Sequence, residues 1–334
     1  MKRLGRFLLR ALAVVVVLVV LVFAVRLVNG LRYPTPESLT GDLKDASRYS
    51  LSQPGMTVER LTGDYLNGFH LHPDAVTHRG LVVLWGGSDG GPDYSRAVRL
   101  AGQGYEVLSL FFFGQANQKP LLSEVPLDFF DEVLAWRAQH VPDGPLTVLG
   151  TSKGAELALA LQARYPEIDN VVVYTPTEYV WQGLDLSRPA SSWTFRGEPL
   201  PYVSTQRAAP SATAAMFAAM LFNYPMPLRE LYATAAASDP NAAEARIPLE
   251  LTGHLLAFAG DDDAMWPGDV AANALGAVDP PRTEAHVYPG AGHLFGDHEG
   301  WANGLALGGA PAANATAGTD SDAILDAALA AWHA

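Results

Sequence analysis

The longest apolar run of the chain lies at its N-terminus. Residues 11–25 are all apolar, and Arg10 and Arg26 flank them. With the neighbouring apolar positions, and at about 1.5 Å per residue, this run is long enough to cross the hydrocarbon core of a bilayer as one helix. We therefore expect residues 1–32 to form a membrane anchor. A cleaved signal segment is the alternative, because residues 22–24 resemble a cleavage site.

The hydrophobic pattern changes after the anchor. Residues 33–56 show little periodicity and read as a linker, whereas residues 57–71 alternate as a hairpin with its turn near Asn67 and Gly68. Apolar strands then alternate with helices. The expected strands are 81–85, 105–112, 146–149, 170–174, 254–259 and 285–288. One helix is expected after Pro92, and others are expected over 127–139, 155–165 and 323–332. This alternation predicts an α/β fold, a mostly parallel sheet with helices on both faces, as one domain over residues 57–334.

The alternation lapses between about residues 176 and 250, which we expect to form a cap or insertion. This segment contains an Ala- and Met-rich helix at residues 212–222. Its aromatic residues include Trp181, Trp193, Phe195 and Tyr202. They either pack the cap against the sheet or line an apolar substrate pocket.

Charge is distributed unevenly along the chain. The formal net charge is −13, yet the first 32 residues hold six of the 22 basic residues and no acidic residue, which leaves sixteen basic against 35 acidic residues in the remainder. Lys2, Arg3 and Arg6 precede the apolar run and favour a cytoplasmic N-terminus, with the remainder outside the cytoplasm. The excess of acidic residues in the remainder would repel a phosphate backbone, which argues against nucleic-acid binding.

The chain contains no cysteine. Disulfides, thiolate nucleophiles and Cys-ligated metals are therefore excluded.

A nucleophile motif follows one of the expected strands. Residues 150–154 fit G-x-S-x-G, between the strand 146–149 and the helix 155–165. In the α/β-hydrolase fold this motif places a serine on a tight turn at the helix N-terminus, where flanking glycines avoid clashes. The motif predicts Ser152 as the nucleophile. A loop serine in a glycine turn, or a hydrolase fold without catalysis, is the alternative.

The other members of a catalytic triad are expected on later loops, first the acid and then the histidine. His293 follows the strand 285–288 in a Gly-rich loop, and we expect it to be the base. Three aspartates follow the strand 254–259. We prefer Asp263, with Asp262 second, because the acid usually lies a few residues past the strand.

Backbone amides near the serine are expected to form an oxyanion hole. Residues 86–91 are a glycine-rich loop after the first core strand, and the N–H of Gly87 or Ser88 would act together with that of Lys153. The loop fits neither a Walker pattern nor a dinucleotide fingerprint, so no cofactor is expected. His70 and His72 alternate on one strand, but the sequence suggests no third ligand and we expect no metal site.

Several segments together resemble the C-terminal catalytic domain that acyl-CoA thioesterases share with bile-acid-CoA:amino-acid N-acyltransferases. The likeness covers roughly residues 80–334. It rests on residues 86–91 (GGSDGG), 125–130 (VPLDFF), 151–159 (TSKGAELAL), 180–183 (VWQG), 192–197 (SWTFRG), 244–248 (EARIP) and 290–293 (GAGH). The resemblance implies an acyl-transfer enzyme with Ser152 as nucleophile, Asp263 as acid and His293 as base.

The resemblance also implies what accepts the acyl group. Within this family, the thioesterases resemble enzymes with a serine nucleophile, whereas the transferases use a cysteine nucleophile. Ser152 therefore implies water as the acyl acceptor. We thus expect a serine acyl hydrolase that cleaves a thioester or carboxylic ester of a small molecule or lipid. An acyltransferase to an amine or alcohol, and a non-catalytic binding module, are the alternatives. Residues 33–80 are too short for the β-sandwich domain of the eukaryotic members, and an extracytoplasmic location would favour an ester or a lipid over a CoA thioester.

Overall fold

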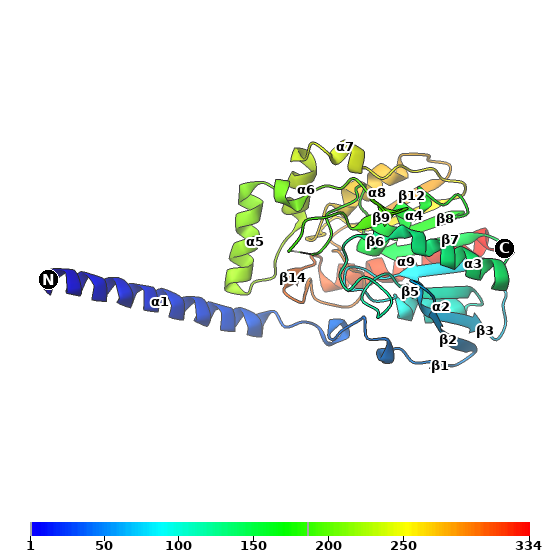
Figure 1. Cartoon of the computed structure of the whole chain (residues 1–334). Helices are drawn as coiled ribbons and strands as arrows, with labels where there is room; N and C mark the ends of the chain where they lie inside the picture. Colours follow the sequence, from blue (N-terminus) through cyan, green and yellow to red (C-terminus); the bar gives the residue numbers. More distant parts are fainter. Residues whose placement is uncertain (1, 186) are drawn as a thin grey trace.

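The chain forms one large sheet covered by helices (Figure 1). The computed structural model describes residues 2–185 and 187–334, so Met1 and Leu186 lie outside the described residues. A nine-stranded sheet has the order β1-β2-β3-β5-β4-β7-β8-β11-β12. Its strands from β5 to β12 are parallel, and β1 to β3 extend one edge antiparallel. This topology confirms the predicted α/β-hydrolase fold.

The strands of this sheet are β1 (Ser52–Gln53), β2 (Met56–Thr62), β3 (Asn67–Pro73), β4 (Leu81–Trp85), β5 (Glu106–Phe111), β7 (Leu146–Thr151), β8 (Asn170–Tyr174), β11 (Leu255–Gly260) and β12 (Thr283–Tyr288). Shorter strands outside it are β6 (Val125–Pro126), β9 (Trp193–Phe195), β10 (Glu198–Pro199), β13 (Trp301–Ala302) and β14 (Leu305–Ala306). The α-helices are α1 (Lys2–Arg32), α2 (Tyr94–Gly102), α3 (Phe130–His140), α4 (Lys153–Gln162), α5 (Pro210–Phe222), α6 (Arg229–Ser238), α7 (Ala242–Ala245), α8 (Gly268–Gly276) and α9 (Pro311–Trp332). Single 3₁₀ turns are η1 (Glu37–Leu39), η2 (Ala46–Arg48), η3 (Leu127–Phe129) and η4 (Thr205–Arg207).

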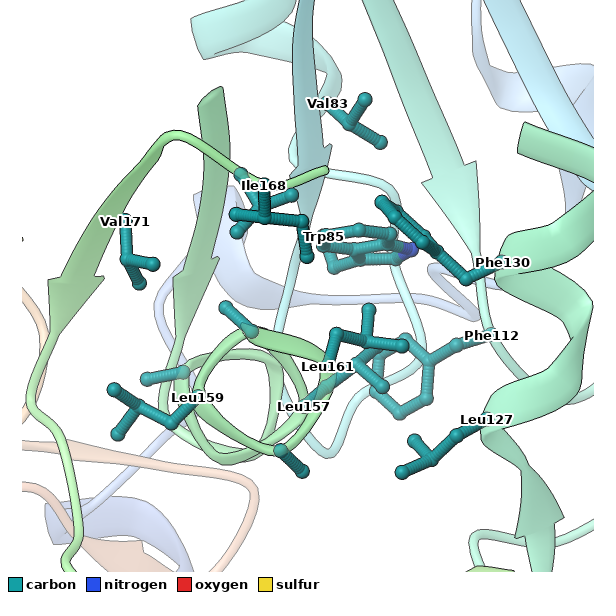
Figure 2. Close-up of a cluster of buried hydrophobic side chains, with 14 of the residues drawn as sticks. Val83, Trp85, Phe112, Leu127, Phe130, Leu157, Leu159, Leu161, Ile168 and Val171 are labelled. Carbon is teal, nitrogen blue, oxygen red and sulfur yellow. The ribbon is translucent and has the colours of Figure 1, made fainter. Parts of the chain in front are cut away.

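Alternating side chains of the central strands build two hydrophobic cores, one on each face of the sheet. Val83 and Trp85 of β4 face one core, which includes buried residues of α3, α4 and α8. Val82 and Leu84 face the other core, which includes buried residues of α2 and α9. Figure 2 shows the first core, with Trp85 beside Phe130. Because both faces are buried, the parallel strands read as continuous apolar runs in the sequence.

The first hairpin differs from its predicted register. The turn lies at residues 63–66, and Asn67 already pairs with Thr62 as the first residue of β3, so the turn predicted near Asn67 and Gly68 is wrong. A carboxylate from α3 explains the difference. Glu132 accepts backbone N–H bonds from residues 64, 65 and 66 at 2.8 to 3.2 Å. A tertiary contact therefore sets this turn and overrides the local Asn-Gly preference.

The C-terminal helix is longer than predicted. The sequence pattern indicated a helix only over 323–332, whereas α9 begins at Pro311. Its first half is rich in Ala and buries small or polar residues such as Asn314 and Ala317. These residues give no apolar stripe, so the periodicity could not mark where α9 begins. The short helix α8, which is also rich in alanine, was not predicted for the same reason.

The cap occupies residues 176–250, described here except for Leu186. It contains α5, α6, α7 and the strands β9 and β10, and a small cluster with Trp181, Tyr232 and Trp266 joins it to the loop after β11. The cap packs beside the end of the sheet where the parallel strands finish (Figure 1).

The N-terminal segment has two parts. One described helix, at Arg6–Arg32, is long and apolar enough to cross a membrane, and it extends away from the body (Figure 1). The following residues 33–56 run along the body, where the Tyr49 ring packs 5.1 Å from that of Tyr94 and 5.5 Å from that of Phe69.

Candidate active site

Ser152 lies on a sharp turn between β7 and α4. Its φ of 57° is in the left-handed region, which is uncommon for a residue with a side chain. The glycines two residues before and after it leave room for this turn. A Cβ on Gly150 would lie 1.9 Å from the carbonyl oxygen of Gly154, and one on Gly154 would lie 2.0 Å from that of Gly86. The tight approach of three backbone segments therefore requires the G-x-S-x-G pattern.

The structure brings Ser152, His293 and Asp263 together from three loops at the carboxyl edge of the sheet. Ser152 Oγ lies 2.8 Å from His293 Nε2, and His293 Nδ1 lies 2.8 Å from Asp263 Oδ2. All three residues are buried. This chain of contacts has the geometry of a nucleophile, a base and an orienting acid.

The three aspartates after β11 have different partners. Asp263 is 1% exposed, and its second oxygen accepts backbone N–H bonds from Met265 at 2.7 Å and Trp266 at 3.2 Å. Asp262 accepts from the N–H of Gly309, and Asp261 from that of Gly290. Among the three, Asp263 is the one whose carboxylate contacts His293.

Two residues that the sequence did not indicate hold the histidine loop. Asn314 of α9 is fully buried, and its Oδ1 accepts the N–H of Gly292 at 2.7 Å, next to His293. Trp266 places its ring edge-on to His293 at 5.7 Å and donates its indole N–H to the Thr175 carbonyl. Because Trp266 closes the acidic loop after β11, its place near the acid could have been noticed in the sequence. Nothing in the pattern of α9 singled out Asn314.

Two of the predicted oxyanion donors, Gly87 and Lys153, lie beside the serine. A Cβ on Gly87 would lie 3.3 Å from Ser152 Cβ, so the 86–91 loop passes in contact with the nucleophile. Lys153 is the first residue of α4, where a backbone N–H has no partner within the helix. In the described part of the chain, no acceptor is found for the N–H of Gly87, Ser88 or Lys153.

The Lys153 side chain points away from this site and ties the nucleophile turn to the cap. Its ammonium lies 2.7 Å from Glu156 Oε2 and donates to Ser192 Oγ at 2.8 Å. Glu156 also accepts from the Trp181 backbone N–H at 2.9 Å and from the Trp193 indole at 2.8 Å. Burial raises the pKa of Glu156 and lowers the pKa of Lys153, and their mutual attraction offsets part of both shifts. The sequence analysis gave Lys153 only a backbone role.

A cavity of about 490 Å³ opens at His293, Gly87 and Thr151. Leu39, Leu43 and Tyr49 of the 33–56 segment also line it. Because that segment has no periodicity, the sequence gave no sign that it reaches the site. A larger hollow of about 710 Å³ lies on the cap around Tyr202 and contains no triad residue.

The cap aromatics mostly pack rather than line this cavity. Trp193 is fully buried against Phe112, and Phe195 packs edge-on to Tyr165. Trp181 belongs to the cap cluster. Of the two expectations for these aromatics, packing is the one that the structure supports.

A histidine pair far from the triad has the third partner that the sequence did not suggest. Glu106 lies 2.9 Å from His70 Nε2 and 2.5 Å from His72 Nδ1. The ligand atoms of these three residues lie within 4.8 Å of one another, so the structure supplies a third candidate ligand that the sequence did not suggest. Glu106 is at the start of β5, opposite the carboxyl edge that carries Ser152. His286 lies within β12, and His298 lines the cavity at His293.

The chain is similar to known proteins of one family. The family model for the BAAT / Acyl-CoA thioester hydrolase C terminal matches residues 125–296. Human acyl-coenzyme A thioesterase 6 is 25% identical over 73% of this chain and 55% of its own length. Mouse bile acid-CoA:amino acid N-acyltransferase is 26% identical over 67% of this chain and 50% of its own. The chain thus spans about half the length of the curated relatives it matches.

The fold has counterparts among solved structures. An esterase from the bacterial hormone-sensitive lipase family aligns with a TM-score of 0.50 at 13% identity, over 94% of this chain and 98% of that one. At this identity the likeness concerns the fold alone.

Proposed function

Because the chain belongs to the BAAT / acyl-CoA thioester hydrolase C-terminal family, we propose that it is a serine-dependent acyl hydrolase that cleaves an ester or thioester. The observation that carries the proposal is the buried contact chain from Ser152 through His293 to Asp263. Residues 57–334 act as one catalytic domain in this proposal, and residues 33–56 connect it to the anchor.

The reaction follows from the positions of these groups. His293 Nε2 takes the proton of Ser152 as Oγ attacks the acyl carbonyl, and Asp263 stabilises the imidazolium that forms. The N–H of Lys153, with that of Gly87 or Ser88, binds the tetrahedral oxyanion. His293 then protonates the departing alcohol or thiol. Water attacks the acyl-enzyme with His293 as base, and the free acid leaves.

The charges around the cavity favour a neutral leaving group. Among its lining residues, Asp89 and Asp93 carry carboxylates and Arg96 carries a guanidinium. Arg96 already pairs with Asp93 at 2.6 Å. The cavity therefore offers no surplus positive charge to an anionic leaving group, which supports a carboxylic ester or lipid at least as well as a CoA thioester.

We propose that α1 anchors the protein in a membrane with its N-terminus in the cytoplasm and the catalytic domain outside. The length of α1 and the basic residues before its apolar run support this topology. A reporter fused to the C-terminus tests it. A reporter active only outside the cytoplasm agrees with the proposal, and one active in the cytoplasm reverses the topology.

Product analysis with the full chain in detergent tests the activity. Short and long acyl esters and acyl-CoAs are offered to the wild type and to Ser152→Ala, with and without an amine or alcohol acceptor. We expect free acid from the wild type and none from the variant. An acyl-amine or acyl-alcohol product that outcompetes free acid would identify a transferase, and equal turnover by both proteins would overturn Ser152 as the nucleophile.

A further inference from the structure

We propose that the cap helix α5 lies in the surface of the membrane that α1 crosses, so that the cap docks on the lipid. This inference rests on the proposed anchor. The outer side of α5 carries large apolar side chains that are open to solvent. Phe217 is 59%, Met220 53% and Leu221 52% exposed, and Tyr224 just beyond the helix is 49% exposed.

The composition of α5 fits an apolar surrounding. Residues 208–228 contain no charged side chain, and within α5 only Ala212 and Ala219 are buried. A helix that is apolar on all sides is normally buried, yet here protein covers only one side. Its 13 residues extend about 20 Å, too short to cross a hydrocarbon core of about 30 Å. Such a helix can instead lie along the interface.

Hydrogen bonds fix the end of α5 to the end of α1. The Arg26 guanidinium donates to the carbonyls of Met220 and Leu221, each at 2.8 Å, and the Asn29 amide donates to that of Phe222 at 2.9 Å. The bonds to Leu221 and Phe222 satisfy carbonyls that a helix C-terminus leaves without partners. Since Arg26 follows the apolar run of α1, they hold α5 at the level where α1 leaves the bilayer. Figure 1 shows α5 running across the direction of α1 at this point.

Aromatic residues gather at the same level. The Tyr33 ring lies edge-on to Tyr224 at 5.1 Å and to Trp301 at 5.2 Å, and the Trp301 indole donates to the Pro34 carbonyl at 3.1 Å. Tyr and Trp concentrate where hydrocarbon meets headgroups. The junction of α1, α5 and the Trp301 loop thus has the residues of a membrane interface, and the occupant of the α5 surface is the bilayer itself.

Single-cysteine labelling tests this placement, because the chain has no cysteine of its own. Full-length Met220→Cys, Leu221→Cys, Val15→Cys and Val76→Cys are labelled with an environment-sensitive fluorophore in phosphatidylcholine and phosphatidylglycerol vesicles, with and without brominated lipid. Val15 reports on α1. Val76 is an exposed apolar control. It lies near Arg79, whose backbone N–H donates to the carbonyl of His333 near the C-terminus. Thermal unfolding checks that each variant is folded.

We expect brominated lipid to quench the labels at 220, 221 and 15 but not the label at 76. Quenching at 15 without quenching at 220 and 221 would overturn the α5 inference and leave the anchor intact. A blue-shifted but unquenched label at 220 would assign this surface to a second copy or another protein and overturn it equally. Absence of quenching at 15, 220 and 221 would overturn the anchor and the α5 inference together.

Discussion

The nucleophile turn is where single residues matter most. Ser152 adopts a left-handed φ, and such backbone strain persists only where the surroundings fix it. Here Gly150 and Gly154 let the turn, α4 and the 86–91 loop meet within van der Waals contact. The two glycines therefore make room for the 86–91 loop as well as for the turn at Ser152.

We predict that Gly154→Ala is destabilising even though alanine is the better helix former. Its Cβ would meet the Gly86 carbonyl, and overpacking of this kind costs about 1–3 kcal/mol. Gly102→Ala in α2 is the matched control, since its Cβ would find only Met56 Cε at 4.0 Å. Thermal unfolding should show a lower midpoint for Gly154→Ala alone. Equal midpoints for the two variants would contradict the tight approach.

We predict that Asp263→Asn lowers kcat by about 10⁴-fold, because an amide neither fixes the required tautomer of His293 nor stabilises its cation. Asp262→Asn should stay near the wild type, since the Asp262 carboxylate contacts Gly309 and not the histidine. Ester hydrolysis by both variants measures the difference. A larger loss in Asp262→Asn would move the acid role to that residue.

Glu106 gives a prediction on pH. Burial raises its pKa, but hydrogen bonds from His70 and His72 outweigh burial and hold the pKa below its usual value. A carboxylate whose pKa is lower in the folded than in the unfolded state raises the free energy of unfolding. This contribution is fully present above the ordinary glutamate pKa of about 4.3, and it is lost as pH falls through the pKa of the folded state. Glu106→Gln should therefore flatten the acid side of the stability profile in urea unfolding, whereas Glu59→Gln, at an exposed position of β2, should not. A profile unchanged in Glu106→Gln would refute this linkage.

At the scale of elements, the Lys153–Glu156 pair joins α4 to the cap. We predict that Glu156→Gln destabilises the protein by about 3–5 kcal/mol, because removing one partner leaves a buried ammonium without its counter-charge. Asp279→Asn at the exposed pair with Arg282 should cost no more than about 1 kcal/mol. Denaturant unfolding compares the two. Equal losses would mean that the buried pair is not coupled to the fold.

The elements also show what the sequence could and could not predict. Apolar runs located β4, β7, β8 and β11 closely, and G-x-S-x-G with the later aspartates and His293 gave the residues that the fold brings together. The hairpin turn was misplaced because Glu132, far along the chain, holds it. The contributions of Leu39, Leu43 and Asn314 to the site depend on tertiary contacts in segments without periodicity, so no local pattern could reveal them.

At the scale of the whole molecule, residues 33–56 connect α1 to the cavity at His293. Residues 33–56 leave α1 and place Leu39 and Leu43 at the cavity that His293 lines. Leu39 and Leu43 make the cavity partly apolar on the side that this segment forms. In the function proposed above, this arrangement suits acyl substrates that partition into a bilayer better than fully soluble ones.

The most direct test of the account is labelling of the full-length protein with a fluorescent fluorophosphonate, which reacts with an activated serine whatever the natural substrate. Wild type, Ser152→Ala and His293→Ala are compared after thermal unfolding has shown that each is folded. The account predicts strong labelling of the wild type and loss of labelling in both variants. A folded wild type that does not label, or labelling that survives in Ser152→Ala, would contradict it.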